Sequence, residues 1–554
     1  MKRFLRLFAI FGLSFTLTAC DEKSWLEEEP LDFYSPVNSY STESDFNAAV
    51  ATLYVNVRNT LFDVNTMHGR AMHYPTDLVW CTIALAHDLN LYQDKLFPNS
   101  VEVQSVWSGL YQVIFNANAI IGRIDGDGIR FSSEEAKNSL KAEAYFFRAF
   151  AMRSLAILYG GVPIILDEIT APKRDFVRAG REEVWQQCVQ DLLIASQNLP
   201  EITNVREEGR ISKAVAFHLL SEVYISLKNW DAAIQAASAV LDNPNFSLMK
   251  ERFGSKKNAP GDVYGDLFKR NNQNRSSGNR EGLWVDQYEY LKPGGGNGNQ
   301  MAWAINPFYI QLKDTEEVNL FIGPTTKNGG RPIGWLSGTD YMSHEIWAKG
   351  SDDDIRNSEY NIIRDIKSDN PDSKYYGQYI VASGAISKFP NTYNRWWSMI
   401  YAKLTPFNED YPTEFITNTA TGLVNNQATK SFTDSYLIRL AETYLLRAEA
   451  YIGKGDNGLA AADINMIRAR AHATPASPEE MSIDYILDER ARELHWEELR
   501  VMTLMRLGKM VERVRKYNAL VGYGIADHQN LWPIPFREIE TNTEAVLQQN
   551  PGYN

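Results

Sequence analysis

Two stretches of the sequence combine aromatic rings with polar side chains at a spacing that suits ligand binding. One covers residues 73–80 (HYPTDLVW), and the other covers residues 284–290 (WVDQYEY) and continues past a glycine run to a further tryptophan. Flat aromatic faces stack on the apolar face of a ring-shaped ligand such as a sugar, while polar groups at the rim bind its hydroxyls. The candidate ligand-binding residues are Tyr74, Asp77, Trp80, Trp284, Asp286, Tyr288, Tyr290 and Trp303.

The second stretch alternates as a strand does. Successive side chains of a strand point to opposite faces, so Trp284, Asp286, Tyr288 and Tyr290 would share one face. That face either meets a ligand or packs in the core.

The motifs that would indicate catalysis or metal binding are incomplete in this sequence. Residues 495–498 (HWEE) lack the second histidine of the HExxH zinc motif. His68, His73 and His87 are spaced by five and fourteen residues, which fits no usual ligand pattern. Glycoside hydrolysis needs two carboxylates across a cleft, and 69 acidic residues make any such pair uninformative. No residue is therefore assigned to catalysis, to a metal or to a cofactor.

Charged side chains repeat in residues 488–493 (DERARE). Asp488 with Arg492 is an i,i+4 pair, and Glu489 with Arg492 and Arg490 with Glu493 are i,i+3 pairs. Neighbours at these spacings meet on a helix surface, so the cluster is interpreted as structural ion pairing along a helix.

The N-terminus predicts export and lipid attachment. Lys2, Arg3 and Arg6 precede an apolar run over residues 7–17, and residues 17–20 (LTAC) resemble the lipobox of bacterial lipoproteins. The run is shorter than the roughly 20 residues that span a bilayer. We therefore expect a signal peptide over residues 1–19 and lipidation of Cys20; the alternative is an ordinary signal peptide with an accidental cysteine.

Removal of the signal's three basic residues takes the formal net charge from −13 to −16. A surface with this charge repels nucleic acid. Cys81 and Cys188 are the two other cysteines and lack CxxC spacing, so they indicate neither a metal site nor a disulfide framework, although one bridge between them stays open.

Helical periodicity dominates the two ends of the mature chain. Helices are expected from about residue 46 and over residues 140–158, where Gly160 and Gly161 end the second. Residues 214–244 and 436–471 each predict two helices with a short break and small residues at the contacts, as in tetratricopeptide hairpins. The fold class is therefore mainly α, with a tetratricopeptide-like hairpin scaffold.

The middle of the chain is loop-rich and holds six of the thirteen tryptophans between residues 270 and 400. Binding residues concentrate on loops that a rigid scaffold supports. The expected division is a tether over residues 20–45, a helical part over 46–255, a variable ligand-binding part over 256–430 and a helical part over 431–554. Residues 20–554 are expected to form one unit.

Several motifs together resemble the SusD/RagB family of outer-membrane nutrient-binding lipoproteins of Bacteroidota. They are residues 141–149 (KAEAYFFRA) with 158–163 (LYGGVP), 439–450 (RLAETYLLRAEA), 465–471 (NMIRARA), 486–494 (ILDERAREL) with Glu497 and Arg500, and 532–535 (WPIP) with Glu538 and 549–553 (QNPGY). Glu498 and Leu499 stand where many members carry Gly-His, a departure that we expect to affect packing only.

The resemblance implies a surface-exposed, non-enzymatic protein that captures a glycan and passes it to a SusC-like, TonB-dependent transporter of the outer membrane. The alternatives are a peptide or other nutrient as ligand, a surface enzyme that degrades glycans, and a tetratricopeptide-type adaptor that binds only protein.

Overall fold

The computed structural model describes residues 40–83, 88–348, 350–386 and 395–553. The predicted signal peptide and Cys20 lie outside these residues. The described chain is mainly α, as predicted, with helices at α3 Glu43–Val57, α4 Met67–Arg70, α5 Tyr92–Lys95, α6 Val101–Arg123, α7 Glu134–Tyr159, α8 Arg181–Asn198, α9 Lys213–Ser226, α10 Trp230–Leu241, α11 Val263–Asp266, α12 Met301–Ile305, α13 Ile346–Ala348, α14 Leu440–Lys454, α15 Asn457–Arg470, α16 Ile483–Leu494, α17 Arg500–Arg506, α18 Met510–Tyr517 and α19 Phe536–Thr541.

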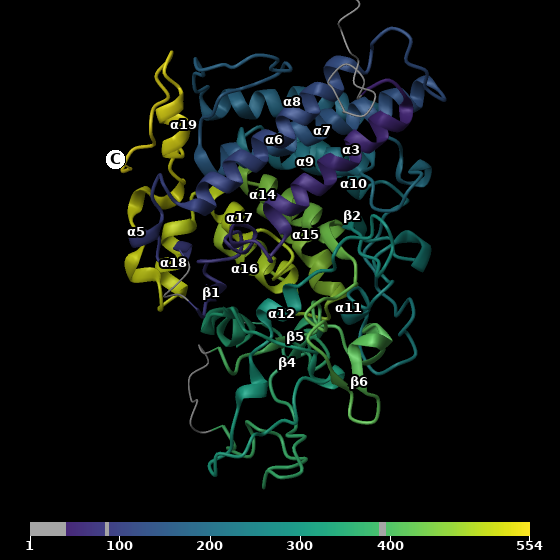
Figure 1. Cartoon of the computed structure of the whole chain (residues 1–554), viewed down its shortest axis with the longest axis vertical. Helices are drawn as coiled ribbons and strands as arrows, with labels where there is room; N and C mark the ends of the chain where they lie inside the picture. The colour runs from purple at the N-terminus through teal and green to yellow at the C-terminus, as the bar shows by residue number, and fades with distance from the viewer. Residues whose placement is uncertain (1–39, 84–87, 349, 387–394, 554) are drawn as a thin grey trace, which may run out of the picture.

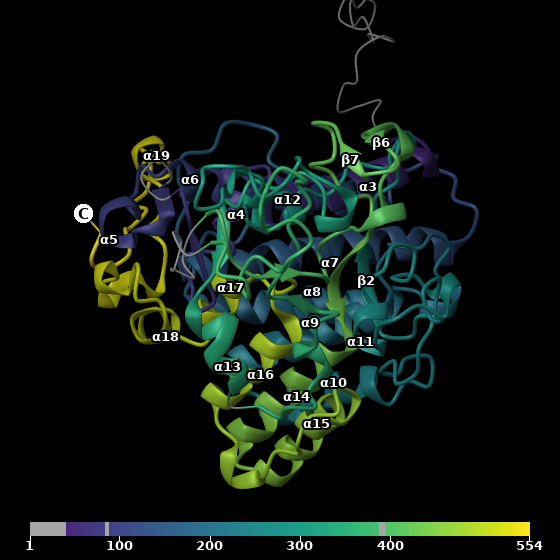
Figure 2. The same ribbon diagram turned by 90° about the horizontal axis from the view of Figure 1, so that it is seen from below.

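The long helices pack as a series of neighbours that forms the upper part of Figure 1. Helix α7 packs on α6 and α8, α9 packs on α8 and α10, and α10 packs on α14, which pairs with α15. The two hairpins predicted from the sequence are thus α9–α10 and α14–α15. Figure 2 shows both hairpins from below, with α10 beside α14 although some 200 residues separate them.

Local sequence signals begin and end these helices. The Thr42 hydroxyl accepts the amide hydrogen of Asp45, and the Asp45 carboxylate accepts the Thr42 amide hydrogen, so a capping box starts α3. Gly160 ends α7 with φ of 77°, a conformation that glycine adopts without strain.

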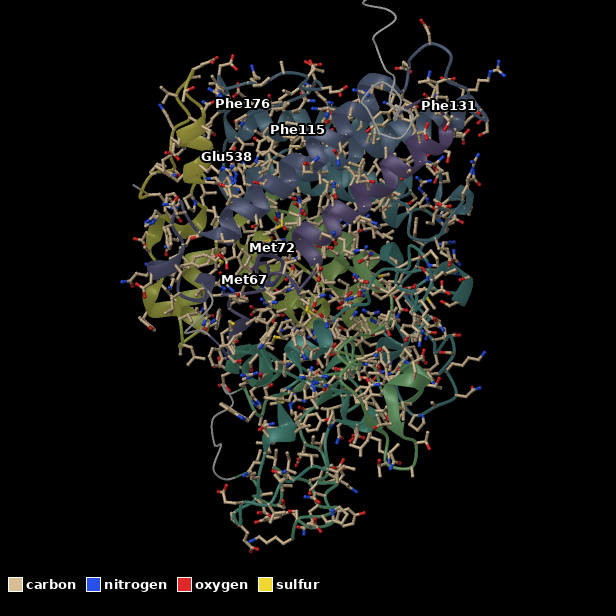
Figure 3. The ribbon with its side chains drawn as sticks, in the orientation of Figure 1. Met67, Met72, Phe115, Phe131, Phe176 and Glu538 are labelled. Carbon is tan, nitrogen blue, oxygen red and sulfur yellow. The ribbon has the colours of Figure 1, made fainter. Side chains whose placement is uncertain are left out.

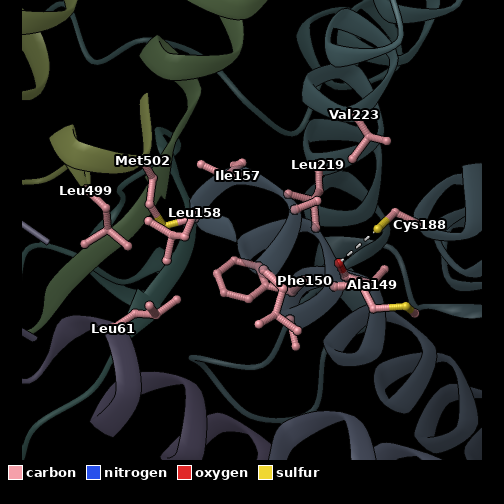
Figure 4. Close-up of a cluster of buried hydrophobic side chains, with 14 of the residues drawn as sticks. Leu61, Ala149, Phe150, Ile157, Leu158, Cys188, Leu219, Val223, Leu499 and Met502 are labelled. Atoms are coloured by element: carbon pink, nitrogen blue, oxygen red, sulfur yellow. Dashed lines mark hydrogen bonds between the residues drawn. The ribbon is translucent and has the colours of Figure 1, made fainter. Parts of the chain in front are cut away.

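Apolar side chains from distant parts of the chain meet between the helices. Figure 4 shows one such cluster, where Phe150 of α7, Leu219 of α9 and Met502 of α17 converge. The thiol of Cys188 lies in the same core and donates to the carbonyl oxygen of Ala149 at 3.5 Å. Cys81 and Cys188 are both free and buried, so the bridge that the sequence left open is absent.

Between α10 and α14 the chain forms loops, short helices and two-stranded ladders, which occupy the lower part of Figure 1. The four ladders that the described residues form are antiparallel. They pair β1 Val79–Cys81 with β3 Leu336–Gly338, β2 Gly282–Asp286 with β8 Ser435–Arg439, β4 Ile362–Ile363 with β5 Ile400–Tyr401, and β6 Ile416–Asn418 with β7 Leu423–Val424. Because β1 and β8 come from the helical parts, two ladders tie the loop-rich part to the scaffold.

Helix α16 carries a buried network of charges that joins the same two parts. Glu489 pairs with Arg356 at 2.8 Å and with Arg468 at 2.9 Å. Glu493 pairs with Arg356 at 3.2 Å and with Arg439 at 3.0 Å. All of these side chains are buried, and Arg356 belongs to the loop-rich part, so ionic contacts cross the boundary inside the protein.

The prediction of ion pairs along this helix is only partly correct. Glu489 pairs with Arg492 at 2.8 Å, as expected. Asp488 instead pairs with Arg513 of α18 at 2.7 Å, and Arg490 pairs with Glu442 of α14 and Glu498. Most partners come from other elements because the helix is buried and its charges need compensation on every side.

Glu498 is one of these buried partners. Its carboxylate forms ion pairs with Arg490 at 2.7 Å and with Arg500 at 2.8 Å. Glu498 therefore has a structural role in the packed interior, where its carboxylate bridges two buried guanidinium groups, and the expectation that this departure from the family pattern affects packing only stays a prediction.

Among the described residues, no helix is both long and apolar enough to cross a membrane.

The network predicts loss of stability in acid. Burial opposes the charge on Glu489, but Arg356, Arg492 and Arg468 outweigh burial and lower its pKa to about 2. Because that pKa lies below the usual value of 4.5 for a glutamate side chain, the folded state binds fewer protons than the unfolded state. The free energy of unfolding should therefore fall as the pH drops from about 5 towards 2.

The variant Glu489→Gln should lower the free energy of unfolding at neutral pH by about 3–5 kcal/mol, since it leaves buried arginines unpaired. It should also lose less further stability in acid, as measured by urea unfolding across pH. The exposed Glu182→Gln serves as the control. If the stability of the variant fell in acid as much as that of the unaltered protein, the acid sensitivity could not be assigned to Glu489.

Candidate functional site

The ladder of β1 and β3 carries an aromatic surface. Trp80 lies opposite Ser337, and the amide of Thr82 donates to the carbonyl oxygen of Trp335 at 2.8 Å. Alternate residues of paired strands share a face, so Trp80 and Trp335 are diagonal neighbours on one side. Cys81 and Leu336 point to the other side and are buried in a hydrophobic cluster. The ladder therefore holds two indoles, both half-buried, on the face away from that core.

Helix α12 adds a third indole. The rings of Trp303 and Trp335 meet edge to face with centroids 4.5 Å apart. The carbonyl oxygen of Trp303 accepts the amide hydrogen of Ile333, which fixes α12 to the segment before β3. Trp303 is half-buried, so the two rings support each other and still meet solvent. We call Trp80, Trp303 and Trp335 the indole patch.

Two arginines border the indole patch. The guanidinium of Arg70, at the end of α4, lies 4.6 Å from the ring centre of Trp335 and donates to the carbonyl oxygen of Val64 at 2.7 Å. Arg395 donates to the carbonyl oxygen of Ile333 at 2.8 Å. The contact with Arg70 is a cation–π interaction, which holds the Trp335 ring in a fixed orientation.

Unpaired donors are a second feature of the patch. The indole nitrogens of Trp80 and Trp303 are shielded from solvent and have no hydrogen-bond partner among the described residues. Because these nitrogens are shielded, the indole patch can offer a ligand its half-buried ring faces for stacking but not these two N–H groups.

Two other predicted site residues of this region are structural. Tyr74 is 1% exposed and Asp77 is fully buried. The Asp77 carboxylate forms ion pairs with Arg500 at 2.7 Å and with Arg513 at 2.8 Å. Burial opposes its charge, but the two guanidinium groups outweigh burial and lower its pKa. Asp77 therefore anchors the segment before β1 to α17 and α18 and has no surface to offer a ligand.

Trp284 is also part of the core, at 3% exposure. Its ring packs edge to face with the rings of Phe146, Phe147 and Phe150 of α7, at centroid distances of 5.7, 5.9 and 5.7 Å. The predicted common face over residues 284–290 does not form, because β2 ends at Asp286 and the register shifts on both sides of Trp284. In this structure Trp284 cannot meet a ligand.

Asp286 and Tyr288 lie in a separate hollow of about 60 Å³ between scaffold and loops. Asp286 pairs with Arg58 at 3.3 Å, and burial raises its pKa. Asp434 lines the same hollow, where burial raises its pKa to about 6. Tyr290 instead packs on Phe415 and Phe432, with ring centroids 5.3 and 4.9 Å away. The predicted site residues Asp286, Tyr288 and Tyr290 are thus not brought together with the indole patch.

Comparison with known proteins identifies the family. The sequence model described as "SusD family" matches residues 266–553, and one described as "Starch-binding associating with outer membrane" matches residues 25–225. This chain belongs to the SusD family. The resemblance seen in the sequence motifs is thereby confirmed.

Relatives cover almost the whole of this SusD-family chain. A SusD-like protein from Formosa agariphila is 25% identical over 98% of this chain and 97% of its own length. The "Starch-binding protein SusD" of Bacteroides thetaiotaomicron is 37% identical over 134 residues, 23% of each chain. A solved structure described as "Laminarin binding SusD-like protein" superposes with a TM-score of 0.68 at 22% identity, covering 93% of this chain and 100% of its own. That superposition confirms the fold.

Sequence reasoning found Trp80 and Trp303 but assigned them to different clusters, and it did not select Trp335 or Arg70. Trp335 belongs to the tryptophan-rich region from 270 to 400, so that enrichment was the available signal. No sequence signal pointed to Arg70, because its role depends on the Trp335 ring that lies beside it in space.

The packing of Trp284 yields a test. Trp284→Ala should lower the free energy of unfolding by about 3–5 kcal/mol, since it leaves a cavity among the α7 phenylalanines. Chemical denaturation measures the change, and Trp396→Ala, at a ring that is 39% exposed, is the control. Equal stability of the two variants would show that the Trp284 ring is not a core residue.

Proposed function

We propose that this chain is a non-catalytic glycan-binding protein and that the indole patch is its binding surface. The observation that carries the proposal is the meeting of Trp80, Trp303 and Trp335 beside Arg70, with all three indole rings half-buried. The names of a laminarin-binding structural neighbour and a starch-binding relative favour a glycan over other ligands.

Affinity in this mechanism comes from stacking. Indole faces cover the apolar face of a sugar ring. Edge-to-face packing of Trp303 on Trp335 and the Arg70 contact hold the rings before the ligand arrives. Little conformational entropy is then lost on binding, which favours affinity.

The residue types of the indole patch favour glycan binding without glycoside hydrolysis. Glycoside hydrolysis uses two carboxyl groups on either side of the scissile bond. The side chains that make up the patch and its border are indoles and guanidinium groups, which provide stacking and hydrogen bonding. Asp77, the acidic residue nearest in sequence to Trp80 among the predicted site residues, is fully occupied by Arg500 and Arg513.

The proposal extends to location and partner. Lipidation of Cys20 would hold the protein at the outer membrane, with residues 20–45 as the tether, and the captured glycan would pass to a SusC-like, TonB-dependent transporter. The family assignment and the description "associating with outer membrane" support this placement. The rigid packing of the helices suits a lid that keeps its shape while it delivers a ligand.

Calorimetric titration of residues 21–554 against a polysaccharide panel that includes laminarin and starch tests the function. We expect saturable binding, and Trp80→Ala, Trp303→Ala and Trp335→Ala should each weaken it by about 1–2 kcal/mol, roughly 5- to 30-fold, through lost stacking. Trp230→Ala, at a half-buried tryptophan of the scaffold, should leave affinity unchanged.

A reducing-end assay on the same mixtures separates the alternatives. New reducing ends would make the protein an enzyme and refute the non-catalytic proposal. Binding that all three indole variants retain would move the site away from the patch. Absence of binding across the panel, followed by saturable binding of peptides, would favour a peptide ligand.

Attachment is tested by Cys20→Ala in the full-length chain. The unaltered protein should fractionate with outer membranes, because several acyl chains on one cysteine make attachment nearly permanent. The variant should leave the membrane fraction, as measured by immunoblotting of separated fractions. A variant that stays membrane-bound after a carbonate wash would refute the lipid anchor.

A further inference from the structure

Arg395 lies at the border of the indole patch, and the proposed stacking does not use its charge. Its Nε donates to the carbonyl oxygen of Ile333 at 2.8 Å. The amide of Ile333 donates to the carbonyl oxygen of Trp303 at 2.9 Å, and Trp335 follows two residues later. A single residue therefore joins the arginine to one ring of the patch and stands close in sequence to another.

Gly334 allows Arg395 to come this close. Its φ is 61°, and a Cβ at this position would lie 2.5 Å from the carbonyl oxygen of Arg395 and 3.3 Å from its Cγ. Both the left-handed backbone and the lack of space favour glycine here. Arg395 thus packs directly against the residue before Trp335, so backbone contacts set its position beside that ring.

The terminal nitrogens of Arg395 are available to a ligand. Only Nε is engaged, and among the described residues no acceptor is bonded to the other two nitrogens. Unlike the indole nitrogens of Trp80 and Trp303, they are not shielded from solvent. The guanidinium carbon lies 5.0 Å from the ring centre of Phe308, a cation–π contact that holds the flat group in place.

The charge of Arg395 is also uncompensated. Burial lowers its pKa, and the group that counteracts burial is the Cys81 thiol rather than a carboxylate. Residues 387–394, which precede it, contain no Asp or Glu. Arg331 lies two residues before Ile333 and is half-buried, and neither arginine has an ion pair within the described part of the chain. The border of the patch therefore carries positive charge without a matching negative group.

We propose that the indole patch binds an acidic glycan, whose carboxylate or sulfate group pairs with Arg395 while the sugar ring stacks on the indoles. The planar guanidinium presents its donors as a fork that matches two oxygens of such a group. This inference rests on the proposed glycan-binding function and narrows its ligand to a charged class. Uronate sugars and sulfated sugars share the oxyanion, and the test below separates them.

The negative charge of the whole protein affects the choice of conditions. The formal net charge of −13 repels a polyanion at long range. At an ionic strength of about 0.15 M the Debye length is about 8 Å, so distant charges are screened and the arginine in contact with the ligand dominates. The titrations are therefore made at this ionic strength.

The test compares matched pairs of oligosaccharides by calorimetric titration into residues 21–554. One set pairs oligomers of galacturonate, glucuronate and mannuronate with their carboxyl-reduced counterparts. The other pairs sulfated dextran and carrageenan oligomers with their desulfated counterparts. At least one acidic oligomer should bind about tenfold or more tightly than its neutral counterpart. A preference in the first set assigns the ligand to uronates, and one in the second set assigns it to sulfated glycans.

Variants of Arg395 test its part in this preference. In Arg395→Gln the ratio of acidic to neutral affinity should fall from about ten to near one, since the side chain keeps polar atoms and loses its charge. Arg395→Lys should keep part of the ratio, because it retains the charge without the fork. Thermal melting checks that both variants are folded.

Arg537→Gln, at an exposed arginine of α19, is the matched control and should keep the full ratio. Figure 3 shows its neighbour Glu538 apart from Met67 and Met72, which stand on either side of Arg70 at the border of the patch. A reduced ratio in this control would show that the preference follows the overall charge of the protein and would overturn the assignment to Arg395.

Three results separate this inference from the proposed function. Equal affinities within every pair, or a preference that Arg395→Gln retains, would overturn the acidic-glycan proposal. Neutral oligomers that still bind, and that the indole variants bind more weakly, would then leave the patch as a glycan-binding surface. Absence of binding to every acidic and neutral oligomer would refute both.

Discussion

Charge compensation inside the protein is the constraint on which the rest of the structure depends. Glu489 and Glu493 are buried on α16, and each is surrounded by guanidinium groups from other elements. Arg356 reaches them from the loop-rich part, and Lys403, from the same part, donates to the carbonyl oxygen of Glu493 at 3.1 Å. An isolated buried charge is expensive, and a compensated one is not. The loops and the helices can therefore reach low free energy only when they are assembled together.

This constraint explains how short strands and irregular loops hold a binding surface. The indole patch rests on a ladder of three residues per strand, which would be marginal alone. Asp77, just before β1, is fastened to α17 and α18 by Arg500 and Arg513, and Leu336 and Cys81 pack in the core beneath. Loop residues on a rigid support can keep a fixed geometry, which is what stacking on a ligand requires.

Much of the fold followed from the sequence because its signals are local. Periodic apolar residues, the glycines after α7 and the paired segments at 214–244 and 436–471 predicted helices that the structure contains, and linear motifs identified the family. The site was predicted only in part. Trp80 and Trp303 were selected by residue type, but whether a ring is buried depends on what packs on it: α7 covers Trp284, while the described residues leave Trp80 half-buried. The meeting of Trp303, Trp335 and Arg70, and the partners of the α16 charges other than the Glu489–Arg492 pair, were decided by tertiary structure, since most of these contacts join residues that are remote along the chain and leave no periodic trace in it.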